Sequence, residues 1–209
     1  MTELQAGLYT RLDDPPAVAA TSAGRPSPGT EVRLVTADGR RCAPGEEGEL
    51  QVRGCSVFPG YFDNPAANAE AFTADGWFRT GDLAVMDAAG NVSLTGRLKD
   101  VINRGGVKFN PRDVEDVLDQ HPGIVQAAVV PMPDPVLGER VCCFVVPASG
   151  HTITLAELCD YLGQRGVAKT KWPERLELVA ELPMTPTRKV IKGQLQALLA
   201  QRLAAERQG

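Results

Sequence analysis

The sequence is poor in the residues that build metal centres and disulfide frameworks. Its 209 residues include two histidines and five cysteines, and no cysteine pair has the Cys-x-x-Cys spacing. Structural zinc sites usually need such closely spaced ligands, so we predict no zinc site. We interpret the cysteines as buried thiols of a cytoplasmic protein, because that compartment keeps thiols reduced. They are Cys42, Cys55, Cys142, Cys143 and Cys159.

Long apolar runs and a one-sided charge are also missing. A membrane-spanning helix needs about 18 or more apolar residues in succession, and no stretch approaches this length. Met1 to Gln5 has neither the basic nor the apolar part of a secretion leader. The 22 basic and 26 acidic residues are interspersed and sum to a net charge of -4. We therefore expect no membrane span and no nucleic-acid partner.

The composition that is present favours compact folding, with 43% hydrophobic residues, enough for one good core or two small ones. Residues 1 to about 30 are rich in Pro, Gly, Ala and Ser, and predict an extended connection. From Glu31 to Gly96, short alternating segments separated by turns predict a small antiparallel, β-barrel-like subdomain. Asn64 before Pro65 predicts one short helix within it, because asparagine caps helices and proline suits their first position.

After Gly96 the pattern changes to longer apolar segments and amphipathic helices. The expected helices begin at Asn110-Pro111, at the capping box Thr154–Glu157 and at Gly193, and the expected strands are 125–130, 141–146 and 176–179. We predict an α+β protein of two domains, 1–96 and 97–209. The second is expected to be a mobile domain with a small sheet flanked by helices.

One stretch with chemical potential is Gly76-Trp77-Phe78-Arg79-Thr80-Gly81-Asp82. It places Asp82 on a glycine turn directly after an aromatic strand. A carboxylate in that position can accept two hydrogen bonds from the neighbouring hydroxyls of a ribose. Taken alone, the pattern is more typical of a turn aspartate that bonds its own backbone.

A second stretch crosses the predicted domain boundary. It runs from Gly96 to Glu115 and contains Arg97-Leu98-Lys99-Asp100, followed by Gly105-Gly106. Such an order suits a swivel and then a close approach of the backbone to a ligand. Out of context, the charged tetrapeptide is a polar linker and the two glycines are a turn.

A third stretch is the Pro- and Thr-rich segment 182–192, which presents Arg188, Lys189 and Lys192 just before the last expected helix. A lysine on such a loop can reach developing charge on a phosphate or carboxylate. In isolation, Lys189 would be an ordinary solvated surface lysine.

In this order and spacing, the three stretches resemble the C-terminal signature motifs of the acyl-adenylate-forming superfamily. This superfamily includes acyl- and aryl-CoA synthetases, peptide-synthetase adenylation domains and firefly luciferase. Other segments that are similar to it are Met1-Thr2-Glu3, Gly29-Thr30-Glu31, Gly45–Leu50 with Val52-Arg53-Gly54, and Phe58–Phe62 with Asn64-Pro65. The resemblance extends over essentially the whole chain.

The resemblance implies an ATP-dependent, AMP-forming acid–CoA ligase that uses ATP, Mg²⁺ and coenzyme A. Such an enzyme joins a carboxylic acid to the α-phosphate of ATP and then transfers the acyl group to a thiol. The implied roles are cofactor binding for Thr2, Asp82, Arg97, Gly105 and Gly106, catalysis for Lys189, a hinge for Lys99 and a metal ligand for Glu3.

Two departures from the family pattern bear on activity. The family's loop lysine usually follows glycine, whereas Arg188 precedes Lys189 here. The Ser/Thr/Gly-rich phosphate loop and the acyl pocket do not occur in these residues, so we expect the 209 residues alone to adenylate poorly or not at all. Arg104-Gly105-Gly106 and 166–175 are most similar to activators of aryl and cyclic acids. A ligase that loads a carrier protein and a non-enzymatic nucleotide-binding remnant stay as alternatives.

Overall fold

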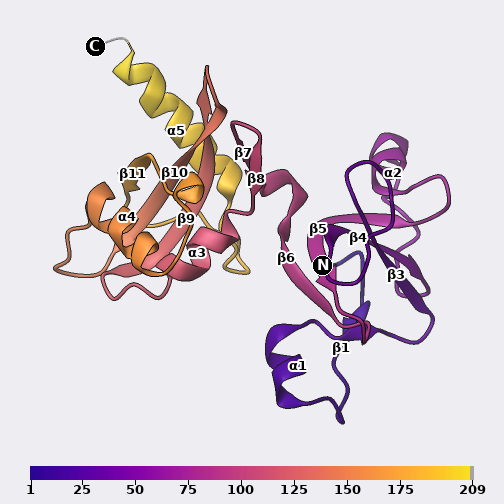
Figure 1. The fold of residues 1–209 in the computed structure, drawn as a ribbon. Helices are drawn as coiled ribbons and strands as arrows, with labels where there is room; N and C mark the ends of the chain where they lie inside the picture. The colour runs from indigo at the N-terminus through magenta and orange to yellow at the C-terminus, as the bar shows by residue number, and fades with distance from the viewer. Residues whose placement is uncertain (208–209) are drawn as a thin grey trace. The chain divides into compact units, whose positions relative to one another are not determined.

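The computed structural model describes residues 1–207, and the chain forms two compact units that divide after Lys99 (Figure 1). This boundary lies close to the one expected between residues 96 and 97. Both helices and sheets are present, so the predicted α+β class is confirmed.

The first unit contains an antiparallel sheet of four strands in chain order: β3 (Thr30–Val35), β4 (Glu47–Gly54), β5 (Phe78–Met86) and β6 (Val92–Arg97). Within residues 1–207, β3 and β6 are edge strands that do not pair with each other. The expectation of a barrel-like subdomain is therefore wrong in this respect, because the sheet is open. Four strands are too few to close around an interior filled by side chains.

The first thirty residues hold more regular structure than expected. β1 (Leu8–Tyr9) pairs with β2 (Arg25–Pro26), and the short helix α1 (Pro16–Thr21) lies between them in sequence. Gly24 permits this pairing: its φ is 85°, and a Cβ there would lie 2.0 Å from the Tyr9 carbonyl oxygen. Pro15 and Pro16, which suggested an extended segment, instead begin the helix, at its N-cap and at its first position.

The sheet's apolar face forms the first unit's core. Leu50 and Val52 of β4 pack there with Ala84 of β5, and Leu4 and Leu8 of the N-terminal segment cover them. The predicted helix is confirmed as α2 (Pro65–Ala71), whose N-cap Asn64 accepts a hydrogen bond from the Ala67 amide at 3.1 Å.

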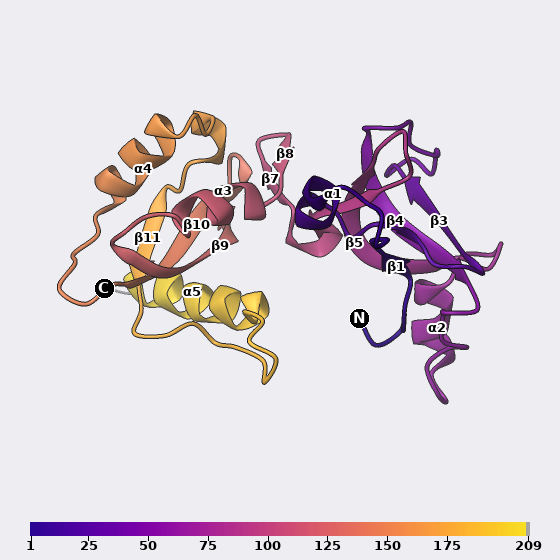
Figure 2. The same cartoon turned by 90° about the horizontal axis from the view of Figure 1, so that it is seen from below.

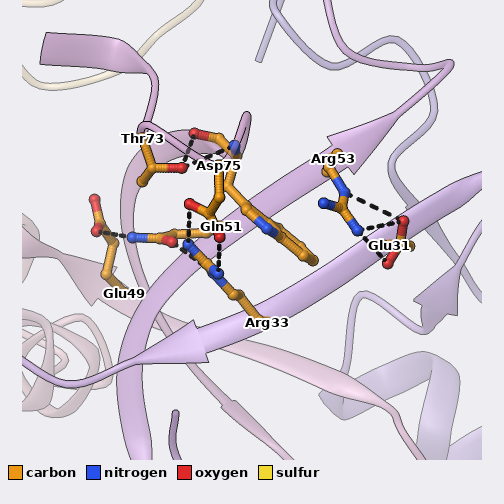
Figure 3. A network of polar contacts seen from close by, with 8 residues as sticks. Glu31, Arg33, Glu49, Gln51, Arg53, Thr73 and Asp75 are labelled. Carbon is orange, nitrogen blue, oxygen red and sulfur yellow. Dashed lines mark hydrogen bonds and ion pairs between the residues drawn. The ribbon is translucent and has the colours of Figure 1, made fainter. Parts of the chain in front are cut away.

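The opposite face of β3, β4 and β5 carries a network of charged and polar side chains (Figure 3). The indole of Trp77 lies between the guanidinium groups of Arg33 and Arg53, whose carbons are 4.5 and 4.6 Å from the ring centroid. Arg33 also donates to Gln51 at 2.8 Å and to Asp75 at 2.8 Å. These contacts join β3 and β4 to the turn before β5, the strand that carries Asp82.

The second unit is built on β10 (Gly138–Pro147). This strand pairs antiparallel with β9 (Ile124–Asp134) and parallel with β11 (Arg175–Leu178). A hairpin of β7 (Ile102–Arg104) and β8 (Val107–Phe109) joins β10 through the pair Arg104 and Gly138. The three expected strands are confirmed, whereas the β7–β8 hairpin was not predicted.

Three helices cover the two faces of this sheet. The helices α3 (Arg112–Leu118) and α4 (Leu155–Gln164) pack on one face, and α5 (Lys192–Glu206) packs on the other (Figure 2). In β10, Cys143 and Val145 point to the first face, and Cys142 and Phe144 to the second. Because both faces are buried, the strand is a continuous apolar run. The predicted capping box of α4 is also confirmed.

We expected all five cysteines to be buried, and this expectation is wrong. Cys142 and Cys143 are buried, Cys42 and Cys159 are partly buried, and Cys55 is exposed. None of the helices in residues 1–207 has the length and apolar character needed to cross a bilayer.

Candidate functional site

Asp82 lies on an irregular part of β5. Glu49 is paired with Leu83, and Gln51 with Arg79, so the single residue Leu50 faces the segment Thr80–Asp82. This bulge uses Gly81 in a left-handed conformation with φ of 68°, which costs glycine little. Bulges re-aim side chains, and here the bulge places the Asp82 carboxylate at a cavity.

Thr80 fixes the bulge from inside, a role that we did not predict. Its hydroxyl is buried and donates to the Leu50 carbonyl oxygen at 2.7 Å. The same hydroxyl accepts a hydrogen bond from the Asp82 amide at 3.0 Å. Because the Thr80 hydroxyl bonds both the Leu50 carbonyl of β4 and the Asp82 amide of β5, it ties the backbone at Asp82 to β4.

Arg97 of β6 lies directly opposite Asp82, and its Nε is 3.0 Å from Asp82 Oδ1. The Asp82 side chain is 20% exposed and that of Arg97 is 49% exposed. A pair in which one partner is half exposed contributes little to stability, typically about 0–1 kcal/mol. A carboxylate also has more acceptor sites than one guanidinium nitrogen uses, so Asp82 can accept further hydrogen bonds from a ligand.

The carboxylate borders an open cavity of about 230 Å³ in the first unit. Its walls include Leu50, Asp82 and Leu94 from the sheet, and Leu4 and Gly7 from the N-terminal segment. A largely apolar wall beside one carboxylate is suited to a flat ring attached to a hydroxylated sugar. Leu4, Gly7 and Leu94 were not predicted, since only the folded chain brings them to Asp82.

The N-terminal segment also holds Glu3 next to the aromatic residue Tyr61. The Tyr61 hydroxyl donates to Glu3 Oε1 at 3.2 Å, and burial followed by this bond raises the pKa of the phenol. No cluster of three or more His, Cys, Asp or Glu occurs within residues 1–207. A single carboxylate fits Mg²⁺ that is bound mainly through phosphate oxygens and water. Thr2 is exposed.

Gly105 and Gly106 form the two-residue turn between β7 and β8, with φ of 58° and 90°. Such hairpin turns need positive φ at both central positions, which explains the two glycines. The Gly105 amide donates to the Leu137 carbonyl oxygen at 2.9 Å, and a Cβ at Gly105 would lie 3.1 Å from the Leu137 side chain. A Cβ at Gly106 would point into open space.

An ion pair holds the base of this hairpin. Arg104 donates to Glu174 through two nitrogens, at 2.7 and 3.2 Å, and both side chains are about three-quarters buried. The hydrogen bond from Arg104 lowers the pKa of the Glu174 carboxyl against the opposing effect of burial. Glu174 also accepts from the Val141 amide at 3.4 Å, so it connects the hairpin to β10.

Lys189 lies in a closed loop before α5. The stem is joined by a bridge between Met184 and Val190, and the Lys189 amide donates to the Thr185 hydroxyl at 3.0 Å. The Lys189 side chain is exposed. Arg188 has a φ of 60°, the left-handed conformation that glycine adopts without strain. The position at which the family usually has glycine therefore has the backbone conformation that favours glycine.

The structure thus distributes the predicted residues over the two units. Asp82 and Arg97 are in direct contact in the first unit, while the glycine turn and Lys189 belong to the second. Lys99 is exposed in a short 3₁₀ turn, Leu98–Asp100, at which the two units divide.

Two family models match the chain. The model of the AMP-binding enzyme matches residues 1–62, and that of the AMP-binding enzyme C-terminal domain matches residues 113–189. The chain belongs to the AMP-binding enzyme family. Lys189 is the last residue of the second match, whereas Asp82 and Arg97 lie between the two.

Curated relatives are similar over most of this chain. It is 48% identical to the 2-hydroxy-7-methoxy-5-methyl-1-naphthoate–CoA ligase of Streptomyces carzinostaticus, over 90% of this chain and 34% of that protein. It is 47% identical to the salicyl-AMP ligase / salicyl-S-ArCP synthetase of Mycobacterium tuberculosis, over 88% of this chain and 33% of that protein. The chain therefore spans about a third of the length of these relatives.

Solved structures are similar in fold as well. ATP-bound MatB from Rhodopseudomonas palustris aligns with a TM-score of 0.85 and 32% identity, covering 95% of this chain and 39% of MatB. The amide bond synthetase McbA from Marinactinospora thermotolerans aligns with a TM-score of 0.75 and 35% identity, over 85% of this chain and 36% of McbA.

Proposed function

We propose that the chain is part of an ATP-dependent, AMP-forming ligase that activates a small carboxylic acid and transfers its acyl group to the thiol of coenzyme A. The observation that carries this proposal is the Asp82 carboxylate, which a glycine bulge and the Thr80 hydroxyl aim at an open, mostly apolar cavity. This arrangement suits a nucleoside, with the carboxylate on the ribose hydroxyls and Arg97 nearby.

In the first half-reaction, a carboxylate oxygen of the acid attacks the α-phosphorus of ATP, and the bond to pyrophosphate breaks. We assign Lys189 to this step, because its ammonium group can offset the charge that gathers where two anions meet. Thr2 is proposed to face the phosphates and Glu3 to hold Mg²⁺, which would neutralise phosphate charge. The fixed Glu3 carboxylate supports the latter assignment.

In the second half-reaction, the thiol attacks the acyl carbon and AMP leaves. We assign the Gly105-Gly106 turn to the thiol side, where the missing side chain of Gly106 leaves open space for the pantetheine arm. Lys99 is the proposed hinge between the two half-reactions, and its position at the division of the units supports this role.

The test has two parts. Calorimetric titration of AMP into the chain should give saturable binding that the variant Asp82→Ala loses. A ligase that carries this chain should exchange pyrophosphate into ATP only when a suitable acid is added, and Lys189→Ala should slow the exchange by about 10²–10³-fold. Binding of AMP without exchange for any acid in a broad aliphatic and aromatic panel would instead favour a nucleotide-binding module.

A second candidate is a ligase that loads an aryl acid onto a carrier protein. The relatives favour it as much as the CoA ligase, because a CoA ligase and a salicyl-S-ArCP synthetase are 48% and 47% identical to this chain. The two candidates differ only in the thiol. Offering the preformed acyl-adenylate free CoA or a phosphopantetheinyl carrier separates them, and we expect faster transfer to CoA.

A further inference from the structure

The loop of residues 182–192, here called the lysine loop, carries Arg188, Lys189 and Lys192, and the environment of Lys192 differs from that of the other two. Lys192 is the first residue of α5, and its Nζ lies 2.7 Å from Glu115 Oε1 of α3. Their side chains are only 18% and 17% exposed. Arg188 and Lys189 are exposed, so the loop's three cations are not equivalent.

Glu115 is itself fixed by the backbone of the sheet. The same Oε1 accepts a hydrogen bond from the Val129 amide of β9 at 2.7 Å. One carboxylate therefore connects α3, β9 and the beginning of α5, which is the point where the Lys189 loop ends. Charge-assisted hydrogen bonds of this kind are stronger than neutral ones.

Lys192 lies at a position in α5 where a cation is unfavourable, so its ion pair with Glu115 needs an explanation. The beginning of a helix carries partial positive charge and disfavours a cation. The first turn of α5 has no acidic residue and no side-chain cap. Glu115 therefore offsets the ammonium charge of Lys192 at a helix end where α5 itself supplies no acid.

The loop is attached to the unit through this end. The Ile191 amide donates to the Pro183 carbonyl oxygen at 2.8 Å. Further along the stem, the Thr185 amide donates to the Lys189 carbonyl oxygen at 2.8 Å, and the Lys189 amide donates to the Thr185 hydroxyl at 3.0 Å. Any displacement of residue 192 moves Ile191, and with it the stem that carries Lys189.

We propose that Lys192 is a positioning residue, which anchors the Lys189 loop through Glu115 and does not itself bind phosphate. The inference rests on the proposed role of Lys189 in adenylation. The pair gives the loop one preferred position, and a displaced ammonium group would stabilise the transition state less well.

The structural test is hydrogen exchange of the 209-residue chain. Lys192→Gln and Glu115→Gln should each speed exchange of the Lys189 and Ile191 amides about fivefold. Glutamine at 115 keeps an acceptor for the Val129 amide, which favours retention of the fold. Lys192→Arg should keep the slow exchange. The matched control is Lys171→Gln, which breaks the other lysine–acid pair of α3, to Asp113 at 2.7 Å. If the control and the test variants change exchange equally, the proposal is overturned.

The kinetic test uses a ligase that carries this chain. Lys192→Gln should lower kcat of pyrophosphate exchange about tenfold with little change in the KM of ATP, because positioning and not binding is lost. Lys192→Arg should restore most of the rate. A raised KM for ATP with unchanged loop exchange would show that Lys192 binds phosphate, and would overturn the inference while leaving the ligase assignment intact. If the variants speed amide exchange in the loop but the unmodified ligase adenylates no acid, the proposed function is rejected, and the anchoring role of Lys192 is retained.

Discussion

Asp82 and Lys189 are held in opposite ways. Asp82 lies in a strand that is paired on both sides, and its backbone is fixed by the Thr80 hydroxyl. Lys189 is on an exposed loop that is closed at its stem and held beside it by the Lys192–Glu115 pair. A sheet gives a ligand-binding carboxylate one position, whereas a loop lets a cation approach and leave the reacting atoms.

This contrast shows where stability and mobility are placed. In the first unit, disorder at Asp82 would require several strand contacts to break. In the second, a local opening of the loop needs few contacts to be lost, so it can occur at low free energy without unfolding β9 and β10. Substitutions at the two positions should therefore differ in what they change.

The largest expected effect is that of Lys189→Ala on adenylation. Loss of a cation at the developing charge typically costs about 10²–10³-fold in rate. Pyrophosphate exchange should fall by this amount, while transfer from a preformed acyl-adenylate to the thiol stays near the unmodified rate. Lys169→Ala is the control for removal of an exposed lysine in the same unit. Equal losses in both half-reactions would contradict the division of roles.

A smaller effect is expected for Asp82→Asn on nucleotide affinity. The amide keeps the shape but loses the charge-assisted hydrogen bonds, so the Kd for AMP should rise about tenfold. Thermal unfolding should change little, because the pair with Arg97 is exposed. Calorimetry measures both quantities, and Asp63→Asn serves as a control at an exposed acid. An unchanged Kd would remove Asp82 from the site.

The backbone at Arg188 provides a third test, of stability. Left-handed conformation costs non-glycine residues about 1–2 kcal/mol, and glycine in exchange loses more entropy on folding. Arg188→Gly should raise the free energy of unfolding by about 0.5 kcal/mol or leave it unchanged. Arg188→Val should lower it by about 1 kcal/mol, since branching at Cβ worsens the strain. Denaturant unfolding measures both, and equal stabilities would contradict the assigned conformation.

The smallest effect concerns the acid dependence of the second unit. Because Arg104 lowers the pKa of Glu174 from its ordinary value of 4.5, this pair stabilises the fold fully above that value. The contribution is lost as the pH falls through the lower, folded pKa. Glu174→Gln should reduce stability near pH 7 by about 0.5 kcal/mol, because the neutral amide keeps an acceptor for Arg104 and only the charge contribution of the bond is lost, and the difference should vanish in acid. Amide hydrogen exchange of β10, measured for both proteins near pH 7 and in acid, tests this difference in stability.

Local patterns predicted much of the fold. Asn64 and Thr154 act as helix caps, and the apolar runs of the second unit are strands, because caps and periodicity are properties of neighbouring residues. The same reasoning missed β7 and β8, since each is only three residues long and too short for a period. It also missed α1, which is hidden among prolines.

The prediction of the site was limited in the same way as that of the fold. The motifs named Asp82, Arg97, Gly105, Gly106 and Lys189 as residues with chemistry, but they contained no signal for Thr80 as the group that holds the bulge. The contact of Glu3 with Tyr61 spans 58 positions of the sequence, and that of Lys192 with Glu115 spans 77. No local pattern predicts such pairs.

Residue types and their spacing therefore determined the helix caps, the longer strands and the chemical groups that the chain offers, because each of these depends on a few adjacent residues. Register, burial and long-range pairing decided which groups meet: the bulge that turns Asp82 to a cavity, the left-handed Arg188 and the carboxylate of Glu115 beneath the lysine loop. These are decided by packing of the whole unit, where many weak contacts select one arrangement among the many that local preferences allow.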